Sequence, residues 1–118
     1  MLSVTRHRVA DGEQARFLAR AREALDVLRS RPGFVAATVG RSTDDAHLFV
    51  IATTWDDVGS FRRALSSFEA RVTAVPLLST AIGEPTAFER LLDASDPALT
   101  VRPSDRAPDA DDGDRVRG

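Results

Sequence analysis

Apolar residues recur along the first 92 positions with two different spacings, and each spacing predicts a different kind of element. A helix is expected over residues 13–29, because apolar residues there fall three or four positions apart and share one face. That stripe consists of Phe17, Ala21, Ala24, Leu25 and Leu28. The charged residues of this segment, Arg16, Arg20, Arg22, Glu23 and Arg29, are expected to lie largely on the solvated side.

A second helix is predicted directly after the only tryptophan of the chain. Asp56 or Asp57 begins it, because a carboxylate there accepts hydrogen bonds from free backbone amides and complements the positive helix end. Its apolar stripe consists of Val58, Phe61, Leu65 and Phe68. Pro76 is expected to break or restart a helix between residues 69 and 82.

Four segments read as strands. They are Leu2–Val9, Phe34–Gly40, His47–Trp55 and Thr86–Leu92. The second and third are joined by a short polar turn and form a hairpin. The element order is then β-α-β-β-α-β, which predicts an α+β, ferredoxin-like fold with a four-stranded antiparallel sheet and the helices on one face.

The strand that ends at Trp55 has an unusual composition. The eight residues from Leu48 to Trp55 include no charged side chain, which indicates a strand buried on both faces. A single small layer of helices covers only one face of a sheet. We therefore expect a second copy of the chain to cover the other face, in an obligate homodimer.

Composition divides the chain at residue 93. Residues 1–92 are expected to form one domain, whereas residues 93–118 are rich in Asp, Pro and Arg and lack aromatic residues. Such a segment buries too little apolar surface to offset the entropy lost on ordering, so it is expected to be a disordered or loosely attached tail. The alternative is a segment that docks on a partner subunit through Leu99 and Val101.

Composition also excludes several kinds of function. The net charge of −2 argues against a nucleic-acid partner, and the absence of Cys excludes disulfides, thiol catalysis and thiolate metal sites. With two histidines and no His-acid cluster, a metal site is not expected, and the chain lacks a glycine-rich phosphate loop. No apolar run approaches the length of a membrane span or signal peptide, so a soluble, cytoplasmic protein is expected.

What remains is an apolar pocket with a few polar groups, as small-molecule sites usually have. His7 shares a strand face with Thr5 and, in a ferredoxin-like sheet, lies nearer the middle of the third strand than its end. An imidazole there is a candidate proton acceptor, or else a structural histidine with a protein partner. His47, at the hairpin end, is expected to be an exposed turn residue. Trp55 is a candidate pocket wall, or else core.

These features together resemble the antibiotic biosynthesis monooxygenase family of dimeric α+β barrel proteins. The resemblance rests on the long first helix followed by Pro32-Gly33-Phe34, and on the strand-end Trp55 followed by Asp56-Asp57. The helix at residues 61–68 and the closing segment at residues 84–89 complete it, so it covers about residues 1–92.

The resemblance implies a dimer whose two sheets face each other, with a pocket between sheet and helices in each protomer. One branch of the family oxidises polycyclic phenols to quinones with molecular oxygen and without metal or flavin. Another degrades haem through an Asn on the first strand, the strand-end Trp and a helical His. Here Thr5 stands near the position of that Asn and no His follows Trp55, so no haem is expected. The quinone-forming branch has an Asn at the position of Ile51.

The resulting hypothesis is a cofactor-independent monooxygenase that oxidises an aromatic, phenolic or polycyclic small molecule with molecular oxygen. His7 would act as the base for a phenolic proton and Trp55 would orient the ring. The residues expected to bind the substrate are Thr5, Thr53, Ile51, Phe61 and Leu65. The alternative is a non-catalytic dimer that binds a small molecule, favoured by the absence of both Asn residues.

Overall fold

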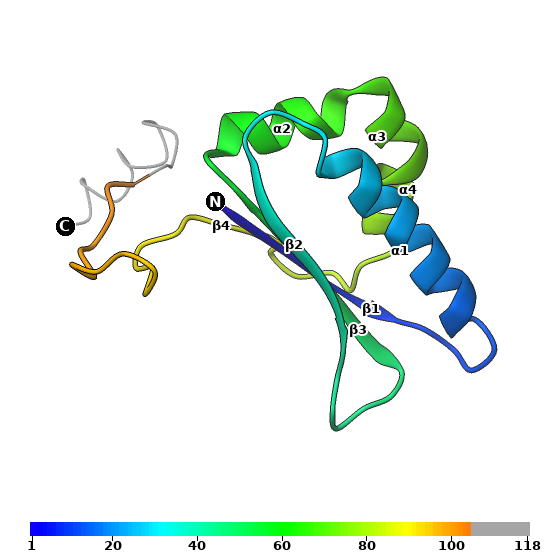
Figure 1. Ribbon diagram of the computed structural model, residues 1–118. Helices are drawn as coiled ribbons and strands as arrows, with labels where there is room; N and C mark the ends of the chain where they lie inside the picture. The colour runs from blue at the N-terminus through cyan, green and yellow to red at the C-terminus, as the bar shows by residue number, and fades with distance from the viewer. Residues whose placement is uncertain (105–118) are drawn as a thin grey trace. The chain divides into compact units, whose positions relative to one another are not determined.

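The computed structural model of the chain describes residues 1–104 and separates two compact units, Met1–Phe88 and the segment from Glu89 onward. The first unit contains all helices and strands of the described residues. Its strands form one four-stranded antiparallel sheet, and its helices lie together on one side of that sheet (Figure 1). The expected α+β fold with a four-stranded antiparallel sheet is confirmed.

The sheet consists of β1 (Leu2–Arg8), β2 (Phe34–Arg41), β3 (Leu48–Trp55) and β4 (Ala87–Phe88). Their spatial order is β2-β3-β1-β4, so β1 and β3 are the central pair and β2 and β4 are the edges. The predicted pairing of the first and third strands is confirmed, with Thr5 opposite Ile51 and His7 opposite Phe49.

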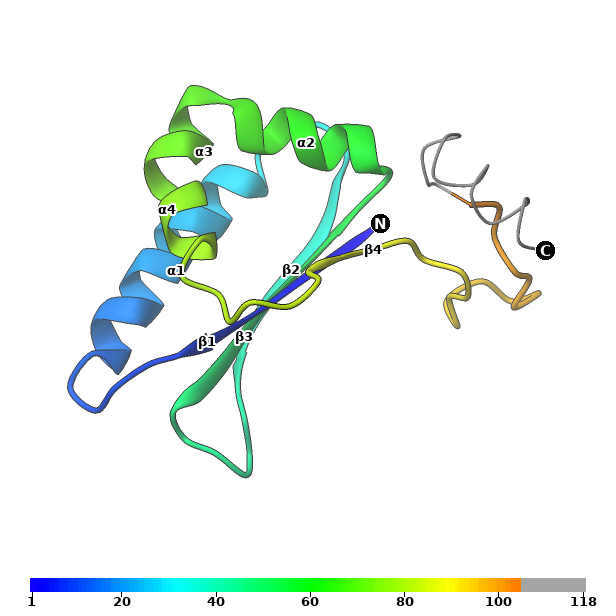
Figure 2. The same cartoon turned by 180° about the vertical axis from the view of Figure 1, so that it is seen from behind.

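The long helix α1 (Gln14–Leu28) lies where the apolar spacing predicts it. Phe17, Ala21, Ala24 and Leu28 are buried, whereas Leu25 is only half-buried. After β3 the chain forms three short helices, α2 (Val58–Ser66), α3 (Phe68–Thr73) and α4 (Val75–Leu78). Seen from behind, α3 and α4 run alongside α1, which they contact (Figure 2).

Side-chain caps determine where these short helices begin. The Asp57 carboxylate accepts a hydrogen bond from Ser60 N at 2.7 Å and begins α2, as one of the two predicted caps. Ser67 then ends α2 in an extended conformation, and its hydroxyl accepts from Ala70 N to begin α3. Pro76 lies in the first turn of α4, so the expected restart at this proline is confirmed.

The break at Ser67 corrects the predicted stripe of the second helix. Phe68 belongs to α3 rather than α2 and is 79% exposed. Val58, Phe61 and Leu65 of the same stripe do pack against the core.

Along β3, burial alternates with each residue. Phe49, Ile51, Thr53 and Trp55 face the helices and are buried, while Leu48, Val50, Ala52 and Thr54 on the outer face are half-buried. Within one chain, then, β3 is covered on one side only. A partner that covers the outer face stays a prediction.

The last predicted strand, residues 86–92, is much shorter in the structure. β4 has two residues, with Ala87 opposite Ser3 and Phe88 opposite Leu2. Because the two strands are antiparallel and Phe88 is already opposite Leu2, the first residue of β1, no residue of β1 is left to extend the pairing beyond Phe88. The prediction of a full-length fourth strand was wrong.

The described part of the second unit, residues 89–104, contains turns but neither helix nor strand. Asp93 organises one of them, since its carboxylate pairs with Arg90 at 3.1 Å and accepts from Ser95 N at 2.9 Å. Of the disordered tail predicted at residues 93–118, residues 105–118 lie outside the described residues.

Candidate functional site

The inner face of the sheet, under the helices, carries a row of buried polar side chains. They are Ser3, Thr5 and His7 on β1 and Thr53 on β3, all at most 4% exposed. Buried polar groups need hydrogen-bond partners, so their partners define what this row can do chemically. All five sheet residues predicted for the site, Thr5, His7, Ile51, Thr53 and Trp55, lie on this face.

His7 and Trp55 lie at opposite ends of that face. His7 is opposite Phe49, the second residue of β3, whereas Trp55 is its last residue. Trp55 lies six positions after Phe49 along the strand, or about 20 Å at the usual rise per residue. The expectation that His7 lies nearer the middle of β3 was therefore wrong, because the register shifts it towards the hairpin. The two side chains do not share one small pocket.

Both ring nitrogens of His7 have hydroxyl partners. Nδ1 lies 3.0 Å from Thr80 Oγ1, and Nε2 lies 2.8 Å from Thr5 Oγ1. The Thr80 hydroxyl donates to Leu77 O at 2.7 Å, so its single proton is already used. Thr80 therefore accepts from His7 Nδ1–H, and Nε2 of the neutral ring accepts from the Thr5 hydroxyl.

Burial reinforces this neutral state. The His7 side chain is 2% exposed and its ring meets the ring of Phe17 edge-on, with centroids 5.4 Å apart. Loss of solvation lowers the pKa of His7 below its ordinary value of 6.5. At neutral pH the ring is thus uncharged and has a lone pair at Nε2, as a general base requires.

A pocket of about 350 Å³ opens onto His7 between β1, the start of α1 and α4. Phe17, Val9, Ala10 and Leu77 supply its apolar surface, and Thr80 lies beside His7. Four charged residues complete the lining, namely Arg8, Arg16, Arg20 and Glu13. We refer to this site as the His7 pocket. Among the predicted site residues, His7 is the only one in its lining.

Trp55 lies at the other end of the inner face and is fully buried. Its indole Nε1 donates to Thr53 Oγ1 at 2.9 Å, and its ring packs against Phe34 and Phe61 at centroid distances of 5.4 and 6.0 Å. Leu65 packs against the same core. A role for Trp55, Thr53, Phe61 and Leu65 in binding substrate stays a prediction.

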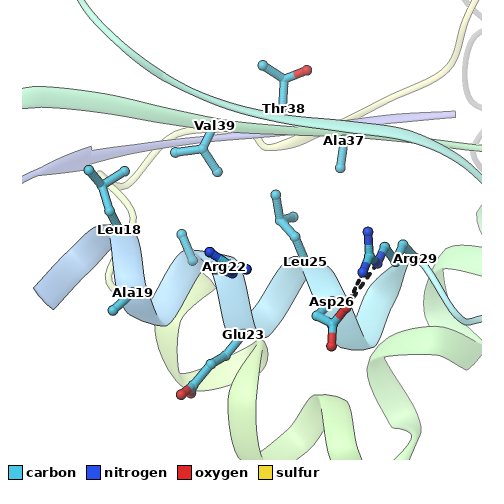
Figure 3. Close-up of a pocket in the computed structure, with 11 residues that line it drawn as sticks. Leu18, Ala19, Arg22, Glu23, Leu25, Asp26, Arg29, Ala37, Thr38 and Val39 are labelled. Atoms are coloured by element: carbon cyan, nitrogen blue, oxygen red, sulfur yellow. Dashed lines mark hydrogen bonds and ion pairs between the residues drawn. The ribbon is translucent and has the colours of Figure 1, made fainter. Parts of the chain in front are cut away.

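A larger cleft of about 1010 Å³ lies on the other side of α1, between this helix and the edge strand β2 (Figure 3). Leu18 and Leu25 point from the helix towards Val39 and Ala37 of the strand, and Arg29 is paired with Asp26 at 2.6 Å. None of the residues predicted for the site lines this cleft, and it shares no lining residue with the His7 pocket. It offers apolar surface but no imidazole.

Sequence reasoning missed two groups at the His7 pocket. Thr80 follows α4 in a stretch without regular spacing, so no pattern in the chain points to it. Arg16 and Arg20 were assigned to the solvated side of the first helix. Arg16 is exposed as predicted and Arg20 is half-buried, but both also line the pocket. Their spacing of four residues places them on one helix face, which was the available signal.

The prediction of an exposed histidine at the hairpin end is confirmed. His47 is exposed, and its Nε2 lies 2.8 Å from the Asp11 carboxylate. Within residues 1–104, no group of three or more His, Cys, Asp or Glu side chains is arranged to hold a metal ion. The same residues include no helix that is both long and apolar enough to cross a membrane.

Comparison with known sequences and structures places this fold in a family. The sequence profile of the antibiotic biosynthesis monooxygenase family matches residues 1–75. The chain belongs to the antibiotic biosynthesis monooxygenase family. No curated protein sequence matches the chain.

Two solved structures illustrate the similarity. SnoaB from Streptomyces nogalater, described as a cofactor-independent oxygenase, is 29% identical, with 76% of this chain and 94% of SnoaB covered and a TM-score of 0.61. A conserved protein from Methanosarcina mazei is 17% identical, with coverage of 73% and 84% and a TM-score of 0.61. Family and fold together support a monooxygenase-type function.

Proposed function

We propose that this protein is a cofactor-independent monooxygenase that oxidises a small phenolic aromatic compound with molecular oxygen in the His7 pocket. The observation that carries the proposal is a buried, neutral imidazole that opens onto a pocket with an aromatic wall. The pocket volume of about 350 Å³ suits a ligand of one or two fused rings. The similarity to SnoaB, itself described as a cofactor-independent oxygenase, supports the reaction type.

The reaction balances without an added reductant. A phenol and one molecule of oxygen give a quinone and one molecule of water. One oxygen atom of O₂ becomes the new carbonyl oxygen on a ring carbon that carried hydrogen, and the second oxygen atom leaves as water. The substrate supplies all the electrons. The protein has to bind the ring, take the phenolic proton and keep competing water away from the electron-rich anion.

His7 takes the phenolic proton at Nε2. In the resting arrangement this nitrogen accepts from Thr5, whose hydroxyl oxygen also lies 3.5 Å from Ile51 O. When the Thr5 hydroxyl turns to that carbonyl, the Nε2 lone pair is released for the substrate. Thr80 keeps the other proton on Nδ1 throughout, because its own proton is donated to Leu77 O. Thr5 and Ile51 thus act on the substrate indirectly, because they control whether the Nε2 lone pair of His7 is free.

Oxygen uptake tests the proposal. A panel of one- and two-ring phenols is offered to the purified protein in the presence of a metal chelator and without flavin or nicotinamide. At least one phenol should consume oxygen and form a quinone. His7→Ala should then lower turnover by about 10²–10⁴-fold, the usual effect of a positioned general base. His47→Ala removes the exposed histidine as a matched control and should leave turnover unchanged.

Full turnover in His7→Ala would show that the base lies elsewhere. If no phenol in the panel consumes oxygen, the second candidate applies, a non-catalytic dimer that binds a small molecule. The observation in its favour is that both nitrogens of His7 already have partners within the protein. Phenols would then bind and shift the melting temperature without any oxygen uptake.

A further inference from the structure

The rim of the His7 pocket carries a net positive charge. Three arginines, Arg8, Arg16 and Arg20, face one glutamate, Glu13, in its lining. A phenol is uncharged before its proton is removed, so the proposed chemistry at His7 does not require three guanidinium groups at the entrance. The charge of the rim points to a further group on the ligand.

The three arginines differ in how far the protein neutralises them. Arg8 pairs with Asp45 at 2.6 Å, and Arg16 pairs weakly with Glu13 at 4.0 Å. The Arg20 side chain forms neither an ion pair nor a hydrogen bond with another residue in the described part of the chain, although Arg20 is half-buried. A guanidinium that is partly removed from water without a carboxylate is stabilised when a ligand supplies one.

The positions of the arginines also point to a ligand with a negatively charged group. Arg16 and Arg20 are four residues apart on α1 and project from the same helix face. Phe17 comes from the same turn and supplies the aromatic wall, with His7 against its ring. A flat ligand lying on Phe17 therefore has His7 towards the base of the pocket and the two guanidinium groups towards its rim.

We propose that the ligand of the His7 pocket is an aromatic carboxylate, with its phenolic hydroxyl at His7 and its carboxylate held by Arg20 and Arg16. This assignment rests on the proposed function for the identity of the hydroxyl end. The guanidinium plane of Arg20 matches the two oxygens of a carboxylate, which a neutral phenol lacks. Specificity for an acid over its neutral analogue then arises from the arginines at the rim of the pocket and not from His7.

Equilibrium binding measures this preference without any turnover. The probes are a hydroxynaphthoate with its hydroxyl and carboxylate at opposite ends and the matching naphthol, titrated anaerobically and followed by their fluorescence. The wild-type protein should bind the hydroxynaphthoate about tenfold or more tightly than the naphthol. Only the acid should lose affinity as sodium chloride is raised, because salt screens its attraction to the rim.

Variants locate the preference. Arg20→Gln should remove most of the tenfold advantage of the acid while leaving naphthol affinity unchanged, and Arg20→Lys should keep much of it. Arg62→Gln removes the same charge at an exposed position of α2, outside both cavities, and should change neither affinity. Melting temperatures near the wild-type value establish that each variant is folded.

The outcomes separate this inference from the proposed function. Equal affinities for acid and naphthol, or an equal loss of both in Arg20→Gln, would overturn the carboxylate assignment. If the naphthol consumes oxygen in that case, the oxygenase proposal still stands. Conversely, an acid-selective site that depends on Arg20, in a protein that oxidises no phenol, would support the carboxylate site and favour the binding function.

Discussion

His7 and Thr80 are 73 residues apart in the chain, yet they are joined by a hydrogen bond of 3.0 Å between Nδ1 and Oγ1. The bond fixes the tautomer of the imidazole, because the Thr80 proton is donated to Leu77 O. In this arrangement the lone pair is at Nε2, facing Thr5. A threonine outside every recognisable motif thus determines which nitrogen of the candidate base accepts a proton.

Thr80→Val tests that relationship directly. The change keeps the shape of the side chain but removes the acceptor for Nδ1–H, so the neutral ring should move towards the tautomer that donates from Nε2 to Thr5. Nitrogen chemical shifts of the ring, measured by NMR on the free protein, report the change. Thr80→Ser should restore the wild-type tautomer. An unchanged tautomer in Thr80→Val would contradict the assignment.

The lowered pKa of His7 also predicts a pH dependence of stability. Burial holds the pKa of His7 below 6.5 in the folded protein, so the unfolded chain binds a proton at higher pH than the folded one. The stabilisation from neutral His7 is complete above about pH 6.5 and is lost as the pH falls below that value. Urea unfolding at several pH values should show this decline.

Matched variants identify the group responsible. The decline should flatten in His7→Gln, because that side chain does not titrate, and should persist in His47→Gln, which removes the exposed histidine. A slope that survives unchanged in His7→Gln would assign the pH dependence to other groups.

Trp55 is predicted to be a major source of stability. Its side chain has no exposed surface and packs between Phe34 and Phe61. Trp55→Ala should lower the free energy of unfolding by about 3–5 kcal/mol. Trp55→Phe should cost about 1–3 kcal/mol, because Thr53 loses the indole donor in a buried site.

Phe68→Ala, at a 79% exposed ring, is the control and should change stability by less than about 0.5 kcal/mol. A cost for Trp55→Ala no larger than that of Phe68→Ala would show that the ring is not core.

Gly33 is required both for its backbone conformation and for the lack of space beside it, whereas Gly12 shares only the first requirement. Its φ is +86°, and a Cβ there would lie 2.3 Å from Ser60 Oγ, whereas Gly12 has φ +85° and open space around it. Gly12→Ala should therefore cost about 1 kcal/mol from backbone strain alone. Gly33→Ala should cost clearly more, since it also displaces Ser60 at the start of α2. Equal costs in urea unfolding would show that Ser60 moves aside freely.

The apolar spacing of the sequence was sufficient to predict the three longer strands of the sheet, α1 and the inner face of β3, because burial on one face imposes a regular period. It failed at Phe68, where the apolar period continues but the Ser67 hydroxyl starts a new helix. It also failed to place Thr80, which α4 brings to His7 by packing on α1. Contacts of this kind depend on how the helices pack in three dimensions, so the spacing of residues along the chain does not predict them.

The outer face of the sheet leads to the last prediction. Leu48, Val50 and Ala52 of β3 are half-buried and uncharged, and Val4 lies beside Ala52 on the neighbouring strand β1. A central strand with an apolar outer face exposes a surface that soluble monomers usually avoid. We expect two copies of the chain to bury this face against each other, as the resemblance to dimeric α+β barrel proteins also implies.

Val50→Asp places a charge in the middle of that face, opposite Arg6 and Gly40. Arg6 is already paired with Glu84 at 2.8 Å, so the new carboxylate would be buried without a partner of its own, which is costly. Sedimentation equilibrium should give the mass of two chains for the wild-type protein and a concentration-dependent shift towards one chain for the variant. Val72→Asp makes the same change on α3, at a residue 60% exposed on the helical layer, and should remain dimeric. A well-folded wild-type monomer at micromolar concentration would refute the dimer. A dimer that dissociates in Val72→Asp but not in Val50→Asp would place the contact on the helices instead of the sheet.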